Sequence, residues 1–389
     1  MNLPKQTGIV IIGAGIQGLL LAAFLHELGR RDVLVLDAGY WEGGASGRNG
    51  TLVRGGFSSP EWAGLFQHSI DQWKTLSRRL GHNVMYTPRG YAIIAESEQS
   101  VDMLRTASKT HQSFSIPSTL MTPDALSKKI PALDANRISA AIYLDDGGTV
   151  PHHAVMKAAL RACQDKAVPV HYGAAVTAVE RTDGRVSGVW VGDHHVKAEL
   201  TVVAAGGQSG DIAQMASVEI EASPFRIEAC ASEPVRPLIQ QAIALVDRMT
   251  YLHQTARGEI VGGTELRGET AKRNLKSSEY VIPRYARNVV EIFPQTHDLR
   301  ILRQWAGYLH PAPDGGPLLG PHPDVESLWF TAGWTYGIAG GPGAADLLSR
   351  AIVSGVTDTR MACFSVDRFR RGKPCIEASA VIDSASSAA

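Results

Sequence analysis

Hydrophobic and polar positions near the start of the chain predict one βαβ unit. Gly8 to Leu25 carries no charge, and a short polar stretch then leads into a second apolar run. Short buried strands appear as continuous apolar runs, whereas a longer run indicates a helix. We expect a strand at Ile9 to Ile12, a helix from about Ile16 to Leu28, and a strand at Val33 to Leu36.

The uncharged stretch is also long enough to suggest a membrane span or the apolar part of a signal peptide. However, Gly13, Gly15 and Gly18 interrupt it, Gln17 lies inside it, and no small-residue cleavage site precedes Glu27. The pattern therefore favours a strand, a tight glycine turn and a helix over a transmembrane segment. Without an export signal, we expect a cytoplasmic protein.

The glycine spacing in this unit is typical of a dinucleotide site. Gly13 permits the tight turn, Gly15 lets the backbone approach a pyrophosphate, and Gly18 lets the helix pack against the strand. Asp37 closes the second strand, where its carboxylate can accept ribose hydroxyls and would repel a 2′-phosphate. The alternative is a glycine-interrupted core strand that binds nothing.

Composition limits the number of domains and the classes of partner but does not indicate a function. A chain of 389 residues suggests two or three domains at roughly 150 residues each. Lys and Arg together number 38, and so do Asp and Glu. Because no net charge attracts a polyanion, we expect no nucleic-acid partner.

Candidate metal and nucleophile patterns are weak. The histidine pairs His152-His153 and His194-His195 have no suitably spaced third ligand, and adjacent residues point in different directions, so we expect no metal site. The segment 207–210 reads Gly-Gln-Ser-Gly and misses the GxSxG elbow of serine hydrolases. The cysteines are far apart and form no CxxC pair, which argues against a disulfide framework or a zinc site: Cys163, Cys230, Cys363 and Cys375.

Glycine clusters and alternating stretches predict a discontinuous two-domain organisation. The glycines gather at 43–56, at 147–148 with 206–210, and at 333–343, which is consistent with one extended ligand. Alternation predicts a hairpin at Asp183-Gly184, a further strand at Ala204 to Gly207, and a hairpin within "MTYLHQTARGEIVGG". The tail from about Ile376 is either frayed or used for docking. We expect a nucleotide domain of residues 1–88, 147–225 and 310–389, with a substrate domain of 89–146 and 226–309.

Several further segments carry a resemblance to a known family. In order they are "GGASGRNGTLVRGGF" (43–57), "DGGTVPHHAVMKAAL" (146–160), "VVAAGG" (202–207), "RQWAGYLHPAPDGGPLLG" (303–320) and "LWFTAGWTYGIAGGPGAADLLSRAI" (328–352). With the βαβ unit, the chain resembles FAD-dependent amine oxidoreductases of the D-amino-acid oxidase type. It is most similar to the β subunits of heteromeric sarcosine oxidases and of dye-linked proline, hydroxyproline and opine dehydrogenases.

The resemblance implies an α/β fold with a Rossmann-like, GR2-type FAD-binding domain and an inserted α+β substrate domain on a mostly antiparallel sheet. It also implies an FAD cofactor. The residues that it assigns to the cofactor are Gly13, Gly15, Ile16, Gln17, Gly18, Asp37, Ala38, Gly44, Ala45, Ser46, Arg48, Asn49, Gly50, Thr51, Val176, Ala205, Gly206, Gly333, Trp334, Thr335, Tyr336, Gly337 and Ile338. A flexible loop is the alternative interpretation of Gly333 to Gly343.

Arg54 matches the arginine that binds the substrate carboxylate in related sarcosine oxidases. A guanidinium suits a carboxylate because two parallel N–H groups can bind it. Arg48 and Arg303 are rival candidates, and pairing with a loop carbonyl or an acid is the structural alternative for Arg54.

Aromatic and histidine side chains complete the predicted catalytic site. Tyr251 and His253 lie two residues apart on the predicted hairpin and so share a face, although a half-exposed sheet face would explain them equally well. Trp305, Trp334 and Tyr336 are expected as aromatic walls beside flavin or substrate.

Two departures from the family pattern bear on the reaction. Family oxidases often carry a lysine near the flavin that helps oxygen react, and our alignment places Ile260 there. Some relatives tether FAD through a cysteine where this sequence has Gly307. Both departures favour a dehydrogenase with non-covalent FAD that passes electrons to an acceptor other than oxygen.

His152 introduces a second cofactor question. In heterotetrameric sarcosine oxidases a β-subunit histidine in a "GGT…H-D-A-V" segment bonds FMN covalently, and "GGTVPHHAV" places His152 there, with His153 in place of the aspartate. The alternatives are an FMN held without a bond at a subunit interface and an ordinary histidine beside Pro151 at a helix start.

The sequence therefore predicts an FAD-dependent dehydrogenase of a small secondary amine or imino acid, acting as the β-like subunit of a hetero-oligomer. Expected partners are subunits that carry an electron acceptor, either ADP-binding or iron–sulfur. A free-standing oxidase that makes peroxide and a catalytically silent flavin-binding subunit are the two alternatives.

Overall fold

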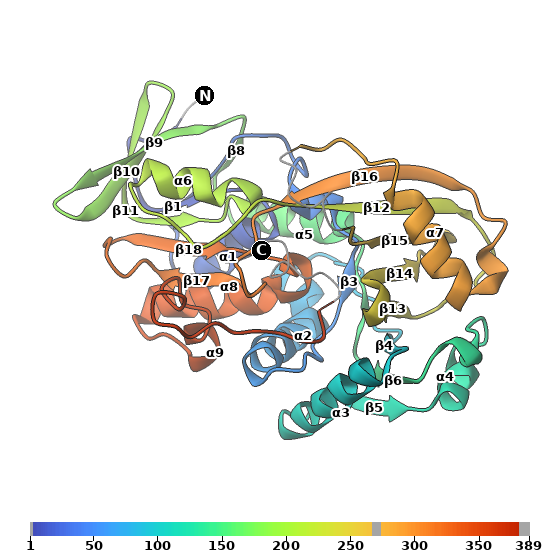
Figure 1. Ribbon diagram of the computed structural model, residues 1–389. Helices are drawn as coiled ribbons and strands as arrows, with labels where there is room; N and C mark the ends of the chain where they lie inside the picture. The colour runs from blue at the N-terminus through green and yellow to red at the C-terminus, as the bar shows by residue number, and fades with distance from the viewer. Residues whose placement is uncertain (1–2, 267–273, 381–389) are drawn as a thin grey trace.

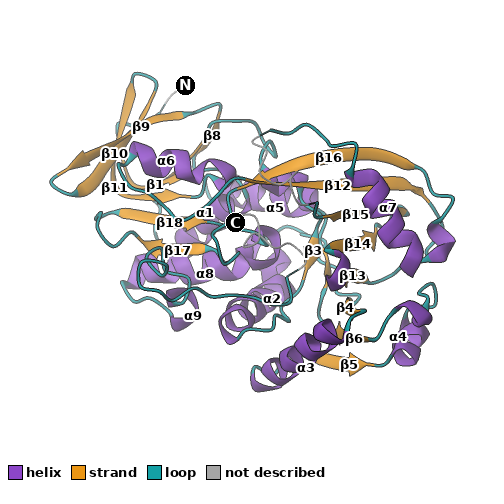
Figure 2. Ribbon diagram, in the orientation of Figure 1, coloured by secondary structure: helices purple, strands orange, loops and turns teal. Residues whose placement is uncertain are grey.

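The computed structural model describes residues 3–266 and 274–380. Two eight-stranded sheets make up most of the molecule, one on each side, with helices packed against them (Figures 1 and 2). A short ribbon of β3 (Leu52–Val53) and β7 (Gly148–Thr149) lies between them. The arrangement confirms the predicted α/β fold class with a second, mostly antiparallel sheet.

The first sheet has a parallel centre, with antiparallel strands added at β17 and at the β9–β10 hairpin. Its strand order is β17-β18-β11-β1-β2-β8, and β17 is antiparallel to β18. The strands β9 and β10 extend it beyond β11 as an antiparallel hairpin. The bounds are β1 Gln6–Ile12, β2 Val33–Asp37, β8 Val170–Tyr172, β9 Val176–Thr182, β10 Arg185–Val191, β11 His194–Val203, β17 Leu318–Pro321 and β18 Leu328–Ala332.

Alternate side chains of β1 enter two different hydrophobic cores. Ile9 and Ile11 join the core on the helical face, while Val10 and Ile12 join the core beneath α6 and the β9–β10 hairpin. Burial on both faces explains why the strand reads as a continuous apolar run. The helices that cover the two faces are α1 Ile16–Glu27, α2 Pro60–Leu80, α5 His152–Asp165, α6 Ser209–Met215, α8 Gly337–Ser354 and α9 Thr359–Ala362.

The second sheet has the order β16-β12-β15-β14-β13-β4-β6-β5. Among the residues that the structure describes, its strand pairs are antiparallel except β13–β4, which is parallel. One face packs against α4 and α7, and the other packs against α3 and faces the first half. The bounds are β4 Tyr91–Ala95, β5 Ser118–Met121, β6 Ala140–Leu144, β12 Phe225–Pro234, β13 Ala242–Leu245, β14 Thr250–Gln254, β15 Glu259–Thr264, β16 Ile301–Leu309, α3 Glu98–Ser113, α4 Pro123–Lys129 and α7 Val281–Ile292.

Local predictions succeeded where turn chemistry and alternation agreed. The hairpin at Asp183-Gly184 and the β14–β15 hairpin are both confirmed. The strand expected at Ala204 to Gly207 is wrong, because β11 ends at Val203. Gly206 has φ of +54° and begins a short 3₁₀ turn, which ends the extended backbone.

From Gly337 onward the third glycine cluster forms the start of α8. This part of the cluster is therefore a helix and not a flexible loop. Gly340 and Gly343 let α8 pack closely, since an added Cβ would lie 2.6 Å from Trp334 and 2.8 Å from Ser69 respectively. The remaining short 3₁₀ elements are η1 Ala45–Arg48, η2 Ala135–Arg137, η3 Gly206–Gln208, η4 Val246–Arg248 and η5 Pro294–Thr296.

Within the described residues no helix is both long and apolar enough to cross a bilayer. Nor do these residues contain a group of three His, Cys, Asp or Glu side chains placed to hold a metal ion.

Candidate active site

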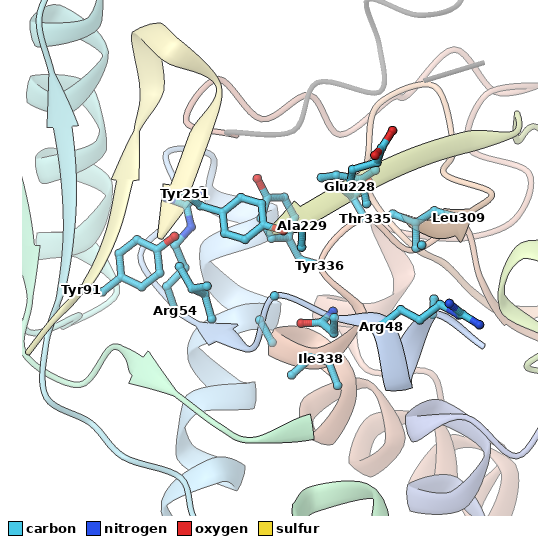
Figure 3. A pocket seen from close by; sticks show the side chains of 17 residues that line it. Arg48, Arg54, Tyr91, Glu228, Ala229, Tyr251, Leu309, Thr335, Tyr336 and Ile338 are labelled. Carbon is cyan, nitrogen blue, oxygen red and sulfur yellow. The ribbon is translucent and has the colours of Figure 1, made fainter. Parts of the chain in front are cut away.

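A pocket lies where the first sheet's loops meet the inner face of the second sheet (Figure 3). The space within it is about 760 Å³ when the open solvent at its mouth is counted. Its lining combines the loop after β2, four strands of the second sheet and the start of α8: Ala45, Arg48, Asn49, Gly50, Leu52, Arg54, Tyr91, Ile227, Glu228, Ala229, Tyr251, Gly307, Leu309, Thr335, Tyr336, Ile338 and Ala339.

Arg54 is the buried cation of this pocket. Only 1% of its surface is exposed, and its carbon Cζ lies 4.2 Å from the centre of the Phe57 ring. Nη2 donates to the Ser379 carbonyl at 2.7 Å, while Nε and Nη1 have no hydrogen-bond partner among the described residues. Because burying an unpaired charge is costly, the pocket is suited to an anion at Arg54.

The rival arginines occupy different positions. Arg48 lines the pocket, but its Nε donates to the Gly43 carbonyl at 3.2 Å and its guanidinium points away from Arg54 (Figure 3). Arg303 is exposed on β16 and does not line the pocket. The geometry therefore favours Arg54 as the substrate-binding arginine.

Two tyrosines of the second sheet, Tyr91 and Tyr251, line the pocket beside Arg54 (Figure 3). Tyr91 and Tyr251 are almost fully buried, and burial raises the pKa of both phenols. Each hydroxyl is therefore neutral and available as a hydrogen-bond donor rather than a base. An added Cβ at Gly50 would lie 2.4 Å from the Tyr251 ring, so glycine is needed for this close approach.

His253 shares the face of β14 with Tyr251 but does not line the pocket. Its Nε2 forms a 2.9 Å hydrogen bond with the Thr51 hydroxyl. Burial lowers the pKa of His253 to about 4, so the ring is neutral. Thr51 has φ of +67°, and the histidine thus supports a strained residue of the loop that the sequence assigned to the cofactor.

The buried neutral imidazole predicts a specific loss of stability in acid. The unfolded chain binds a proton at His253 near pH 6.5 and the folded chain only near pH 4. The neutral His253 therefore does not reduce the free energy of unfolding above pH 6.5. Between pH 6.5 and pH 4 it lowers that free energy by about 1.4 kcal/mol per pH unit. Denaturant unfolding at pH 7.5, 6 and 5 should show a shallower decline for His253→Gln, and the same decline as wild type for the exposed control His297→Gln. Parallel curves for His253→Gln and wild type would contradict the assignment.

The three residues predicted as aromatic walls, Trp305, Trp334 and Tyr336, divide into two groups. Tyr336 lines the pocket, with its ring centre 5.7 Å from Arg54. Trp334 lies in the core of the first half, where its Nε1 donates to the Thr331 hydroxyl at 3.1 Å, and Trp305 donates to the Arg48 carbonyl at 3.0 Å. Neither tryptophan is part of the pocket lining, so Tyr336 is the aromatic wall on this side.

The glycine fingerprint has the expected geometry. Gly13 has φ of +116°, and an added Cβ there would lie 2.3 Å from the Ala204 oxygen. At Gly18 a Cβ would lie 1.9 Å from the Gly13 oxygen. Gly15 is less enclosed, with only the Ser46 hydroxyl at 3.1 Å, and that hydroxyl accepts the Ile16 N–H at 3.0 Å.

Asp37 and Gln17 have structural contacts as well. The Asp37 carboxylate accepts the N–H groups of Ala14 at 2.7 Å and Gly39 at 2.8 Å. An ionised carboxylate has about four lone-pair sites, so capacity for ribose hydroxyls remains. Gln17 donates to the Gly337 carbonyl at 2.8 Å, which ties α1 to the start of α8.

These surroundings fit an FAD molecule. The starts of α1 and α8 supply N–H groups without intrahelical partners, which favour phosphate and a partly negative ring. A Cβ on Gly44 would meet nothing within 4 Å, and the buried Thr335 hydroxyl has no partner among the described residues. The other assigned positions, Ala38, Val176, Ala205 and Gly206, lie at the ends of β2 and β11 and the start of β9, the sheet edge where such ligands bind.

The alignment placed Ile260 near the flavin, but the structure places it on the opposite face of the sheet. Ile260 belongs to the core shared with α7, on the far side of the sheet from the pocket. Gly263 pairs with Tyr251 and therefore faces the pocket. Gly307 does line the pocket, and an added Cβ would lie 3.7 Å from Arg48. No lysine lines the pocket within the described residues.

His152 is the first residue of α5 and is partly buried outside the pocket lining. Burial lowers its pKa. Its neighbour His153 forms a 2.9 Å hydrogen bond with Glu42 and packs edge-on against Trp41.

Part of the pocket lining was not predicted from the sequence. Tyr91, Ile227, Ala229 and Leu309 all line the pocket. Tyr91 begins an apolar run that reads as a strand, and this aromatic start was the one available signal. The partner strands that place it beside Arg54 are far away in sequence.

Comparisons with known proteins agree with this geometry. A model of the family described as FAD dependent oxidoreductase matches residues 8–351. The chain is 27% identical to a sarcosine oxidase subunit beta of Rhodobacter capsulatus, covering 95% of this chain and 90% of that protein, and 24% identical to a glycine oxidase of Pseudomonas aeruginosa, covering 88% and 93%. Among solved structures, L-proline dehydrogenase from P. horikoshii superposes with a TM-score of 0.90 at 24% identity, covering 95% of this chain and all of that chain, which supports the fold. The match of the family model over residues 8–351 shows that the chain belongs to the FAD dependent oxidoreductase family.

Proposed function

We propose that this protein oxidises a small secondary amine or imino acid, with Arg54 holding the substrate carboxylate. The observation that carries the proposal is the buried guanidinium of Arg54, whose Nε and Nη1 lack partners among the described residues at the pocket wall. Relatives named sarcosine oxidase and glycine oxidase act on molecules that have both an amine and a carboxylate. A carboxylate at Arg54 would place the amine among the tyrosines.

Bound FAD would supply the acceptor for the hydride removed from the carbon beside the amine. The residues that would hold it are the α1 fingerprint, Asp37, the loop from Gly44 to Thr51 and the start of α8. Gly307 offers no side chain for a covalent link, which supports a non-covalent cofactor.

The chain's own residues position the substrate more than they perform acid–base chemistry. Tyr91 and Tyr251 stay protonated because burial raises their pKa, and they donate hydrogen bonds rather than remove a proton. The mostly apolar lining of the pocket favours the uncharged amine, the form that can lose a hydride. Catalysis would rest chiefly on orientation and exclusion of water.

We also propose that the chain functions within a hetero-oligomer. Its relatives in Rhodobacter capsulatus, Rhizobium meliloti and an Arthrobacter species are named as subunits of sarcosine oxidase. An ADP-binding or iron–sulfur partner that accepts electrons, and an FMN near His152 at a subunit interface, stay predictions. So does the division into an FAD-binding domain (1–88, 147–225, 310–389) and a substrate domain (89–146, 226–309).

An anaerobic titration tests the function directly. We expect sarcosine, proline, a hydroxyproline isomer or an opine to bleach the flavin absorbance of the purified protein. Bleaching that persists in air and reverses with a dye supports a dehydrogenase, whereas rapid recovery in air supports the oxidase alternative. Absence of bleaching with every amine, in protein that carries FAD, would contradict the proposal and favour a catalytically silent subunit.

A further inference from the structure

The C-terminal segment 375–380 docks against the residues that directly follow Arg54 in sequence. It passes over the start of α2 and ends beside the guanidinium. Cys375 anchors its beginning: the Cys375 N–H donates to the Asp314 carboxylate at 2.7 Å, and Trp62 Nε1 donates to the Cys375 carbonyl at 2.6 Å. Asp314 is itself held by a buried ion pair with Arg368 at 2.6 Å. The segment is thus fixed before it reaches the pocket wall.

Glu377 is the centre of this docking. Its carboxylate accepts the N–H groups of Ser58 at 2.9 Å and Ser59 at 2.9 Å, and the N–H of Ser379 at 2.8 Å. The hydroxyls of the same three serines also donate to it, at 2.5, 3.0 and 2.5 Å. Glu377 is only 8% exposed. A buried carboxylate with this many donors stays ionised, and these hydrogen bonds hold its pKa below the usual value.

The docked segment ends on the substrate-binding arginine. Ser379, held by Glu377, presents its carbonyl to Arg54 Nη2 at 2.7 Å. The same carboxylate fixes Ser58, four residues after Arg54 on the same loop. Glu377 therefore fixes Arg54 in two ways, through the loop that carries it and through the carbonyl that it binds. Nη1 and Nε remain without partners among the described residues.

We propose that Glu377 is a positioning residue for substrate binding: it holds the C-terminal segment so that the Ser379 carbonyl orients Arg54 toward the pocket. This inference rests on the proposed function, because it assumes that Arg54 receives a carboxylate. Glu377 itself does not line the pocket. Without it, Arg54 would lose one fixed hydrogen bond and the loop 55–59 would lose its anchor.

The test uses full-length protein with bound FAD and follows the flavin spectrum during titration with pyrrole-2-carboxylate and with its neutral amide. In Glu377→Ala we expect the dissociation constant of the carboxylate to rise about tenfold, because a misdirected guanidinium loses oriented binding. The dissociation constant of the amide should stay unchanged. With a turned-over amine, KM should rise while kcat stays within about twofold.

Matched variants separate positioning from general damage. Ser379→Ala keeps the carbonyl that Arg54 binds and should retain most carboxylate affinity, and Asp367→Asn, at a neighbouring acid paired with Arg371, should match wild type. Glu377→Gln keeps an acceptor oxygen and should show a smaller rise than alanine, so it carries the test if Glu377→Ala does not accumulate.

Two results would overturn the inference in distinguishable ways. Equal carboxylate affinity in wild type and Glu377→Ala, or equal weakening of carboxylate and amide, would overturn the positioning role alone. A wild-type flavin that neither responds to the carboxylate nor is reduced by any amine would overturn the proposed function, and the positioning role with it.

Discussion

Replacing Arg54 with alanine is expected to lower kcat/KM for a carboxylate-bearing amine by roughly 10²–10⁴-fold while FAD stays bound. Two hydrogen bonds from a charged group to a carboxylate contribute about 1.5–3 kcal/mol each. The site is buried, so water cannot replace them cheaply. The measurement is steady-state turnover with the amine identified by anaerobic reduction, together with the FAD content of each preparation.

Two further variants sharpen this result. Arg54→Lys keeps the charge but not the paired N–H groups, and it should recover only part of the lost kcat/KM. Arg303→Ala removes an exposed arginine outside the pocket and should leave turnover within about twofold of wild type. Full activity in Arg54→Ala would instead mean that the substrate is bound elsewhere or lacks a carboxylate.

The first βαβ unit could be predicted from the sequence because every local signal agreed. Strand β1 is buried on both faces, and the helix after it begins at Ile16, as expected. At Gly13 and Gly18 only glycine fits the backbone contacts. The Asp183-Gly184 turn was equally readable, because Asp183 and Gly184 both have positive φ and alternating strands flank them.

The rest of the site depends on contacts between distant segments. Arg54 and Ser379 are 325 positions apart, and no local pattern indicates that they meet. Tyr91 reaches the pocket because β4 pairs in parallel with β13, the strand that precedes Tyr251. Hydrophobic periodicity shows that such strands exist but does not show which strands are neighbours.

The misplacement of Ile260 has a different physical cause. Side chains of a strand alternate between faces, so an error of any odd number of residues moves every position to the opposite side. The strand β15 was identified correctly, yet Gly263, which pairs with Tyr251, is on the pocket side of the sheet and Ile260 is on the opposite side. Trp334 and Tyr336 would share a face if the chain stayed extended, but it bends at Thr335 and Tyr336 before α8 begins at Gly337. Trp334 therefore lies in the core, whereas Tyr336 lines the pocket.

Gly18→Ala is expected to cost about 3 kcal/mol of folding stability, at the upper end of the usual overpacking range, and to yield protein with little FAD. The new Cβ would lie 1.9 Å from the backbone oxygen of Gly13, and backbone cannot move aside as a flexible side chain can. Either the strand–helix turn distorts or α1 shifts away from the sheet. Denaturant unfolding and the ratio of flavin to protein absorbance would measure both effects.

Gly44→Val is the matched variant that separates an effect on FAD binding from an effect on folding stability. A Cβ there meets no protein atom within 4 Å, and Gly44 has φ of −90°, which valine adopts readily. Apoprotein stability should therefore match wild type, while the dissociation constant of FAD should rise about 30-fold or more because the side chain enters the cofactor's space. Equal FAD affinity in Gly44→Val and wild type would place the cofactor away from this loop, whereas loss of FAD with an intact fold would assign the loop to FAD binding independently of the α1 fingerprint.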